Sequence, residues 1–232
     1  MPPSRLRSAG AEIDAFVRQA RAVAPSKNSS SSGRLILALD ATLSRQPTWD
    51  LACSLQAEMF DAVGKKGGLS VQLVYFRGFG ECRASRFVDD TTKLKELMTR
   101  INCRGGQTQI GKVLSHALKE NQHGKVNAVV YIGDAVEEDI DLLANKAGRL
   151  GMLGVPVFAF QEGHDRAAEI ALREIARLSK GGWFRFDSTS AAALAQLLSA
   201  VAVFATGGLE ALEARGRDSD RLMLAYLRGG RP

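Results

Sequence analysis

RLILALDATLS, residues 34–44, joins a short aliphatic run to a group of oxygen-bearing side chains. Its first seven residues, 34–40, have an uninterrupted aliphatic centre, which is typical of a strand buried on both faces of a parallel sheet. The run stops at Asp40, and hydroxyl groups follow at Thr42 and Ser44. Alternate residues of a nearly extended turn point the same way. The carboxylate and the two hydroxyls are therefore expected to face one common point.

Similar runs recur along the chain and alternate with segments of helical spacing. This alternation predicts an α/β fold with three layers, in which helices cover both faces of a doubly wound, mainly parallel sheet. The run 82–88 is more polar than the others, and we expect it to form one antiparallel edge strand. The predicted strands are 34–40, 69–76, 82–88, 126–132, 155–160 and 183–186; the predicted helices are 46–63, 90–101, 109–121, 138–150, 166–178 and 191–204.

Composition divides the chain into three parts. Residues 1–32 contain a helical pattern at 11–24 and then a Ser-rich linker. Residues 33–204 form the predicted domain. Residues 205–232 begin at a Gly pair and contain a short apolar cluster, which predicts either a tail helix packed on the body or a segment that binds a partner.

The bulk properties exclude several classes of protein. The 232 residues are 45% hydrophobic and 24% charged, which is ordinary for a globular protein and excludes a disordered chain. The net charge is +6, but the basic residues are scattered and not interleaved with aromatics, so nucleic acid is not an expected partner. No signal peptide begins the sequence, and the longest apolar run, 194–204, is too short to span a membrane. We expect a cytoplasmic protein.

Three loops carry the chemistry. Ligands of open parallel sheets bind beyond the carboxyl ends of the strands. Asp40, Thr42 and Ser44 follow the first strand, Thr108 follows a Gly-rich loop before a helix, and Asp134 follows the strand 126–132. These are hard oxygen ligands without imidazole or thiolate, which suits Mg²⁺, Mn²⁺ or Ca²⁺. Taken singly, each residue can also be a helix cap.

The ordered set resembles the von Willebrand factor A domain with its metal-ion-dependent adhesion site. The family motif Asp-x-Ser-x-Ser corresponds to DATLS, residues 40–44, the family threonine to Thr108 in GGQTQIGKV, and the later aspartate to Asp134 in YIGDAVEED. The resemblance covers about residues 33–204. The chain departs from the family at Thr42, where Ser is usual, and at Ala135, where Gly is usual.

The resemblance implies a site and a partner. Ser44, Thr42 and Thr108 would hold the metal, and Asp40 and Asp134 would assist directly or through water. A protein partner would complete the coordination with an Asp or Glu, and Gly106, Gln107 and Ala135 would contact that partner. We expect a bacterial, cytoplasmic binding module. Catalysis is not expected, because the site lacks a nucleophile with a base beside it. The nearby acids Glu137, Glu138, Asp139 and Asp141 are expected to form a solvated helix start.

Two other functions remain open from the residues. In a haloacid-dehalogenase-like phosphatase, Asp40 would attack phosphorus, Thr108 would bind the phosphate and Asp134 would help to hold Mg²⁺. Against this, that family usually has Asp where this chain has Thr42. In a metal-free scaffold, the same oxygens would only cap helices.

Overall fold

The computed structural model describes residues 33–45, 59–63, 68–187 and 190–229. Every described residue belongs to one compact unit within residues 32–232. The predicted helix 11–24, the Ser-rich linker and most of the predicted helix 46–63 lie outside the described residues. Residues 59–63 of that last helix are helical, as predicted.

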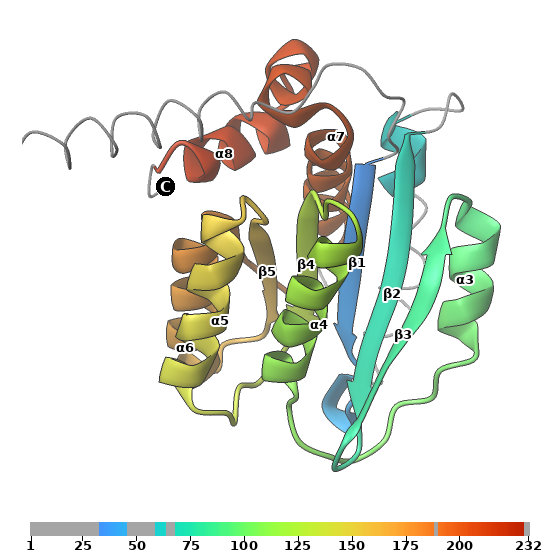
Figure 1. Ribbon diagram of the computed structural model, residues 1–232, viewed down its shortest axis with the longest axis vertical. Coiled ribbons are helices and arrows are strands. Elements are labelled where there is room, and N and C mark those ends of the chain that lie inside the picture. Colours follow the sequence, from blue (N-terminus) through green and yellow to red (C-terminus); the bar gives the residue numbers. More distant parts are fainter. Residues whose placement is uncertain (1–32, 46–58, 64–67, 188–189, 230–232) are drawn as a thin grey trace, which may run out of the picture. The chain divides into compact units, whose positions relative to one another are not determined.

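Six strands form one sheet in the order β3-β2-β1-β4-β5-β6 (Figure 1). All neighbouring pairs are parallel except β2 and β3, which are antiparallel, so the polar run forms the predicted antiparallel edge strand. Because β1 and β4 are central and covered on both faces, every residue of β4 is buried, as expected for an aliphatic run. The strands are β1 (Gly33–Asp40), β2 (Leu69–Arg77), β3 (Glu81–Val88), β4 (Ala128–Gly133), β5 (Val157–Glu162) and β6 (Gly182–Phe186).

Helices cover the two faces of the sheet, which confirms the three-layer prediction. Side chains of α4 (Ile110–His123), α5 (Ile140–Met152) and α6 (Arg166–Ser179) share one apolar core with one face of the strands. The opposite face packs against α3 (Thr91–Thr99), α7 (Ala191–Arg215), α8 (Asp218–Leu227) and the helical residues 59–63. In Figure 1 the carboxyl ends of the parallel strands lie at the lower edge of the sheet.

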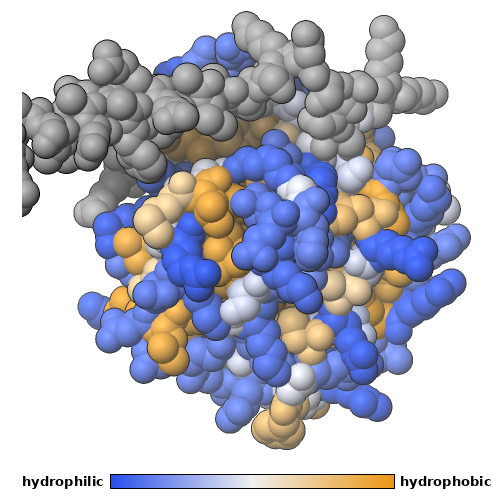
Figure 2. All heavy atoms as spheres, viewed as in Figure 1, coloured by the Kyte–Doolittle hydropathy of each residue, from blue (hydrophilic) through white to orange (hydrophobic). Residues whose placement is uncertain are grey.

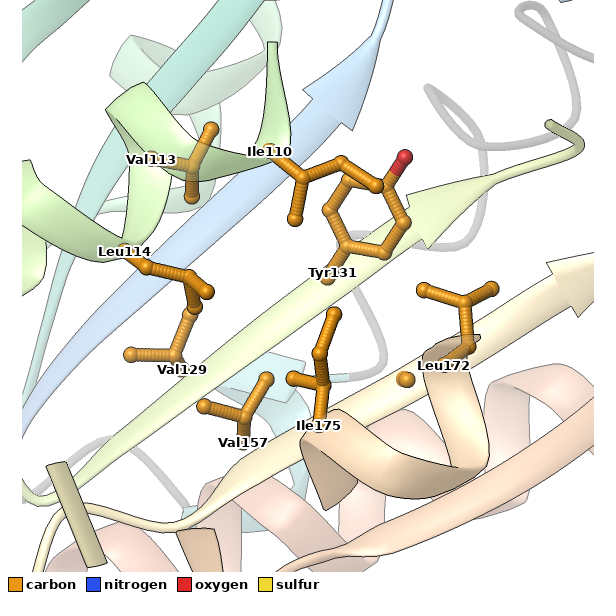
Figure 3. A pocket seen from close by; sticks show the side chains of 9 residues that line it. Ile110, Val113, Leu114, Val129, Tyr131, Val157, Leu172 and Ile175 are labelled. Carbon is orange, nitrogen blue, oxygen red and sulfur yellow. The ribbon is translucent and has the colours of Figure 1, made fainter. Parts of the chain in front are cut away.

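The space between β4, β5, α4 and α6 is filled by apolar side chains (Figure 3). The hydroxyl of Tyr131 is the one polar atom among the side chains drawn there, and no room remains for a water molecule. This region is therefore part of the core, and the candidate site has to be sought at the carboxyl edge of the sheet.

Helix α7 differs from the prediction, which ended it at Phe204. The helix continues to Arg215 and is only kinked at Gly208, whose φ of 67° and ψ of −156° are not helical. It resumes after the kink, and Leu212 beyond it is fully buried. By length and composition α7 could cross a membrane, which the shorter predicted run could not. However, half of its apolar window is buried inside the protein, as in the core helices of many soluble proteins.

The C-terminal segment folds back as α8, which matches the first of the two alternatives for residues 205–232. Met223 and Leu224 are buried, and the hydroxyl of Tyr226 donates to the carbonyl of Trp183 in the edge strand β6 at 2.8 Å. The turn between α7 and α8 is held by an ion pair between Arg215 and the fully buried Asp220. This segment is therefore an integral part of the folded body.

Candidate functional site

Three loops meet at the carboxyl edge of the sheet. The backbone N–H of Arg104 donates to the carbonyl of Ala41, so the loop after β1 contacts the Gly-rich loop before α4 at 3.0 Å. The N–H of Gln107 donates to the carbonyl of Gly78, in the turn between β2 and β3, at 3.2 Å. Thr108 in turn contacts Glu137 in the loop after β4. These contacts join the three loops that carry the predicted ligands.

In the loop after β1, the Asp40 carboxylate binds the backbone of Thr42, and the Thr42 and Ser44 hydroxyls lie next to each other. Asp40 is 1% exposed, and its Oδ1 accepts a hydrogen bond from the N–H of Thr42 at 2.8 Å. The hydroxyl oxygens of Thr42 and Ser44 lie 3.0 Å apart. Thr42 is buried and Ser44 is exposed, so one hydroxyl of the pair lies inside the loop and the other belongs to a surface residue.

Thr108 is buried and binds Glu137 through two hydrogen bonds. Its backbone N–H donates to Oε2 of Glu137 at 2.9 Å, and its Oγ1 accepts from the backbone N–H of Glu137 at 3.0 Å. The hydroxyl therefore faces the loop after β4. The N-cap residue of α4 is Gln109, and the side chain of Gln109 makes no capping bond.

The first turn of α4 is bound instead by Glu138. Its carboxylate accepts from the N–H groups of Ile110 at 2.5 Å and Gly111 at 2.9 Å. Burial, the largest influence, raises the pKa of Glu138 above its ordinary value, although these two backbone donors act against the rise. Unpaired N–H groups at a helix start need acceptors, and here they come from a different loop.

The prediction for the acidic cluster was thus partly wrong. Asp139 does begin a helix, because it caps α5 and accepts from the N–H groups of Asp141 and Leu142. Glu138, however, is partly buried and binds the start of α4, and the exposed Glu137 also accepts a hydrogen bond from Thr108. No local pattern in the sequence signals this role, because it depends on α4 and the loop after β4 lying side by side.

Asp134 carries a buried oxygen that needs a partner. Its Oδ1 is inaccessible to solvent and accepts no hydrogen bond from the described residues. Asp134 does not cap α5, because Asp139 has that role. Just before it, Gly133 has no room for a side chain, since a Cβ would lie 2.3 Å from the hydroxyl oxygen of Tyr131. A buried carboxylate oxygen without a donor is the environment in which a cation or a water is expected.

The predicted ligands fit a hard divalent cation in two respects. Mg²⁺ binds oxygen at about 2.0–2.1 Å, so neighbouring oxygens of its octahedron lie about 3 Å apart. The separation of 3.0 Å between the hydroxyls of Thr42 and Ser44 agrees with this spacing. Asp134 Oδ1 offers a charged oxygen. Among the residues that the structure describes, no three His, Cys, Asp or Glu side chains gather as metal ligands, so a site here depends on hydroxyl groups.

The residues predicted to contact a partner differ in exposure. Gln107 is exposed, whereas Gly106 and Ala135 are partly buried. Gly106 touches the β2–β3 turn so closely that a Cβ would lie 2.2 Å from the carbonyl oxygen of Gly78. The sequence did not reveal that this turn, Gly78-Phe79-Gly80, borders the site; an aromatic residue between two glycines was the available signal.

Comparisons with known proteins support the fold. No family model matches the chain, and no curated protein sequence matches it. Among solved structures, a von Willebrand factor type A protein from Catenulispora acidiphila is 18% identical with a TM-score of 0.59, over 76% of this chain and 43% of that one. The SpRpn10 VWA domain is 15% identical with a TM-score of 0.55, over 72% of this chain and 92% of that domain.

A third structure has a different description. It is an aerotolerance-related membrane protein from Bacteroides fragilis NCTC 9343, 19% identical with a TM-score of 0.56, over 71% of this chain and 98% of that one. At these identities the likeness concerns the fold alone. The strand order, the antiparallel edge strand and these structural neighbours together show that the chain has the von Willebrand factor A fold.

Proposed function

We propose that this protein binds a divalent cation, Mg²⁺ or alternatively Mn²⁺ or Ca²⁺, and through it a carboxylate of a protein partner. The metal ligands would be Asp40, Thr42, Ser44, Thr108 and Asp134. The observation that carries the proposal is the buried Oδ1 of Asp134, which has no hydrogen-bond donor among the described residues. A cation beside it would remove the cost of burying that oxygen unpaired.

The hydroxyl ligands favour an ion that still attracts an outside carboxylate. Two carboxylates and three neutral hydroxyls leave a dication with little surplus negative charge around it. Thr108 retains the capacity to take part, because the N–H of Glu137 occupies one of the two lone pairs of its Oγ1. The exposed Ser44 gives the proposed ion a route to solvent and to a partner.

The two rival functions receive less support. In a metal-free scaffold the oxygens would cap helices, yet Thr108 Oγ1 accepts from Glu137, and α5 is capped by Asp139. In a phosphatase, Asp40 would have to reach phosphorus, yet it is 1% exposed and its Oδ1 accepts from Thr42. Hydrolysis of p-nitrophenyl phosphate that disappears in Asp40→Asn would overturn the proposal of a non-catalytic module.

The carboxylate claim can be tested with synthetic peptides. The full chain is titrated against labelled nine-residue peptides with one central Glu, or Gln in its place, in Mg²⁺ and in EDTA. We expect binding of the Glu peptide that is lost with Gln, with EDTA and in Asp134→Ala. The control Asp218→Ala alters a side chain that is 94% exposed in α8 and should bind as wild type. Equal binding of the Glu and Gln peptides would reject the claim.

A further inference from the structure

The turn between β2 and β3 carries a large apolar side chain into solvent. Phe79 is 86% exposed and lies between Gly78 and Gly80, whose φ values of 60° and 154° suit glycine. In Figure 2 an isolated apolar protrusion lies at the bottom of the molecule, where Figure 1 shows this turn. An exposed phenylalanine has an unfavourable hydration free energy, which contact with a partner would remove.

The turn is held firmly by the Gly-rich loop of the candidate site. The carbonyl of Gly78 accepts from the N–H of Gln107 at 3.2 Å and from Nε2 of Gln109 at 3.3 Å. The carbonyl of Gly80 accepts from Nζ of Lys112 at 3.0 Å. The backbone on both sides of Phe79 is therefore held in place. Gly78, the residue before Phe79, is bound to Gln107, the residue before Thr108.

A second exposed apolar residue lies on the other side of the same loop. Leu43 is 60% exposed, and its Cδ1 lies 3.4 Å from where a Cβ on Gly105 would be. Gly106, the next residue, touches the backbone of Gly78. Leu43 and Phe79 thus flank the pair Gly105–Gly106. Of the predicted ligands, Ser44 directly follows Leu43, and Thr108 follows Gly106 by two positions.

Two exposed basic side chains border this loop, whereas the carboxylates of Glu137 and Glu138 lie at its end, against the start of α4. Arg104 and Lys112 are exposed, and neither forms an ion pair with a carboxylate in the described part of the chain. Lys112 instead donates to the carbonyl of Gly80 and to Gln109. Glu137, on the loop after β4, accepts a hydrogen bond from the backbone N–H of Thr108. An acidic segment would therefore meet the exposed side chains of Arg104 and Lys112 here.

We propose that Leu43, Phe79 and Arg104 form a rim that selects an extended acidic segment of a partner protein. That segment carries a large aliphatic or aromatic side chain within a few residues of its metal-binding carboxylate. The apolar side chain contacts Phe79 and Leu43, and Arg104 contacts further acidic residues. This inference rests on the proposed function, and it adds which carboxylates the site accepts.

The test is an array of nine-residue peptides with a fixed central Glu in a Ser/Gly background, probed with the full chain in Mg²⁺. Leu or Trp is moved through each other position, and a Gln version of each peptide serves as reference. We expect that Leu or Trp at one or two positions strengthens binding about tenfold or more. Phe79→Ser should abolish that gain, and Leu43→Ser should reduce it. Met152→Ser, at an 80% exposed residue at the end of α5, should retain it.

Each result separates the two proposals. Binding that requires Glu and Mg²⁺ but ignores the apolar residue would overturn the rim and leave the metal-dependent function intact. An apolar gain that persists in Phe79→Ser would also overturn the rim. Loss of the Glu and Mg²⁺ requirement would reject the proposed function itself. Self-association of the chain that disappears in Phe79→Ser, measured by sedimentation, would assign the rim to a second copy instead.

Discussion

Thr108 and Glu137 bind each other through two hydrogen bonds that run in opposite directions. The backbone N–H of Thr108 donates to the Glu137 carboxylate, and the Glu137 N–H donates to the Thr108 hydroxyl. The pair fixes the start of α4 to the loop that contains Asp134. Two of the three ligand-bearing loops are therefore fixed to each other within the protein itself.

Replacing Thr108 with Val should remove both a metal ligand and the acceptor for the N–H of Glu137. We expect the free energy of unfolding to fall by about 1–3 kcal/mol, because a backbone donor loses its partner, and Mg²⁺ affinity to be lost. Thr108→Ser keeps the hydroxyl and should retain most of both. Urea unfolding and metal titration measure the two effects. Full Mg²⁺ binding by Thr108→Val would exclude Thr108 as a ligand.

Glu138 predicts a specific pH dependence of stability. Burial raises its pKa in the folded state above the ordinary value of 4.5. Its contribution to stability is therefore fully present below pH 4.5 and is lost as the pH rises through the folded-state pKa. Glu138→Gln cannot titrate and should lack this decline in urea unfolding at a series of pH values between about 4 and 7. An unchanged slope in Glu138→Gln would contradict the assignment.

Gly106→Ala should disturb the site without touching a ligand. The new Cβ would lie 2.2 Å from the carbonyl oxygen of Gly78, so the β2–β3 turn or the Gly-rich loop has to move. We expect lower stability and weaker Mg²⁺ binding. Gly148→Ala in α5 is the matched control, because its Cβ meets nothing within 4 Å and a helical Ala should stabilise by about 1 kcal/mol or less. Wild-type thermal unfolding of Gly106→Ala would show that the close approach is not required.

Asp220 and Arg215 should be essential to the C-terminal turn. Burial acts to raise the pKa of Asp220, but hydrogen bonds from Arg215 and from the backbone of Arg217 outweigh it and hold that pKa below 3.8. The contribution of Asp220 to stability is therefore present above pH 3.8 and is lost as the pH falls through the lowered value.

Asp220→Ala leaves Arg215 partly buried without its carboxylate and should cost about 3–5 kcal/mol in urea unfolding at neutral pH. Asp218 lies two residues before Asp220 and pairs with Arg221 at the surface. Asp218→Ala should therefore cost about 1 kcal/mol or less. Equal losses in the free energy of unfolding would mean that the buried ion pair stabilises the protein no more than the surface ion pair does.

Most of the fold could be predicted because its strands are short aliphatic runs with a helix between most of them. The polar run at Cys82 was sufficient to place an edge strand, since an edge tolerates polar residues on both faces. The end of α7 could not be predicted. Gly207 and Gly208 are a common stop signal, yet Gly208 only kinks the helix, because apolar residues beyond it still find a core.

The candidate site was predictable in composition but not in its supporting contacts. Asp40, Thr42 and Ser44 lie in one short segment, so their proximity follows from local geometry. The roles of Glu137, Glu138 and the turn around Phe79 depend on segments that are distant in sequence and become neighbours only in the folded sheet. The spacing of residues in the sequence therefore does not predict these contacts.

The most direct test of the central claim is a calorimetric titration of Mg²⁺ and Mn²⁺ into the chelator-treated full chain, beside Asp134→Ala and the control Asp218→Ala. We predict saturable binding of one ion per chain in the wild type and in Asp218→Ala, and none in Asp134→Ala with its thermal unfolding otherwise preserved. Equal binding by all three proteins, or by none, would contradict a metal site at Asp134.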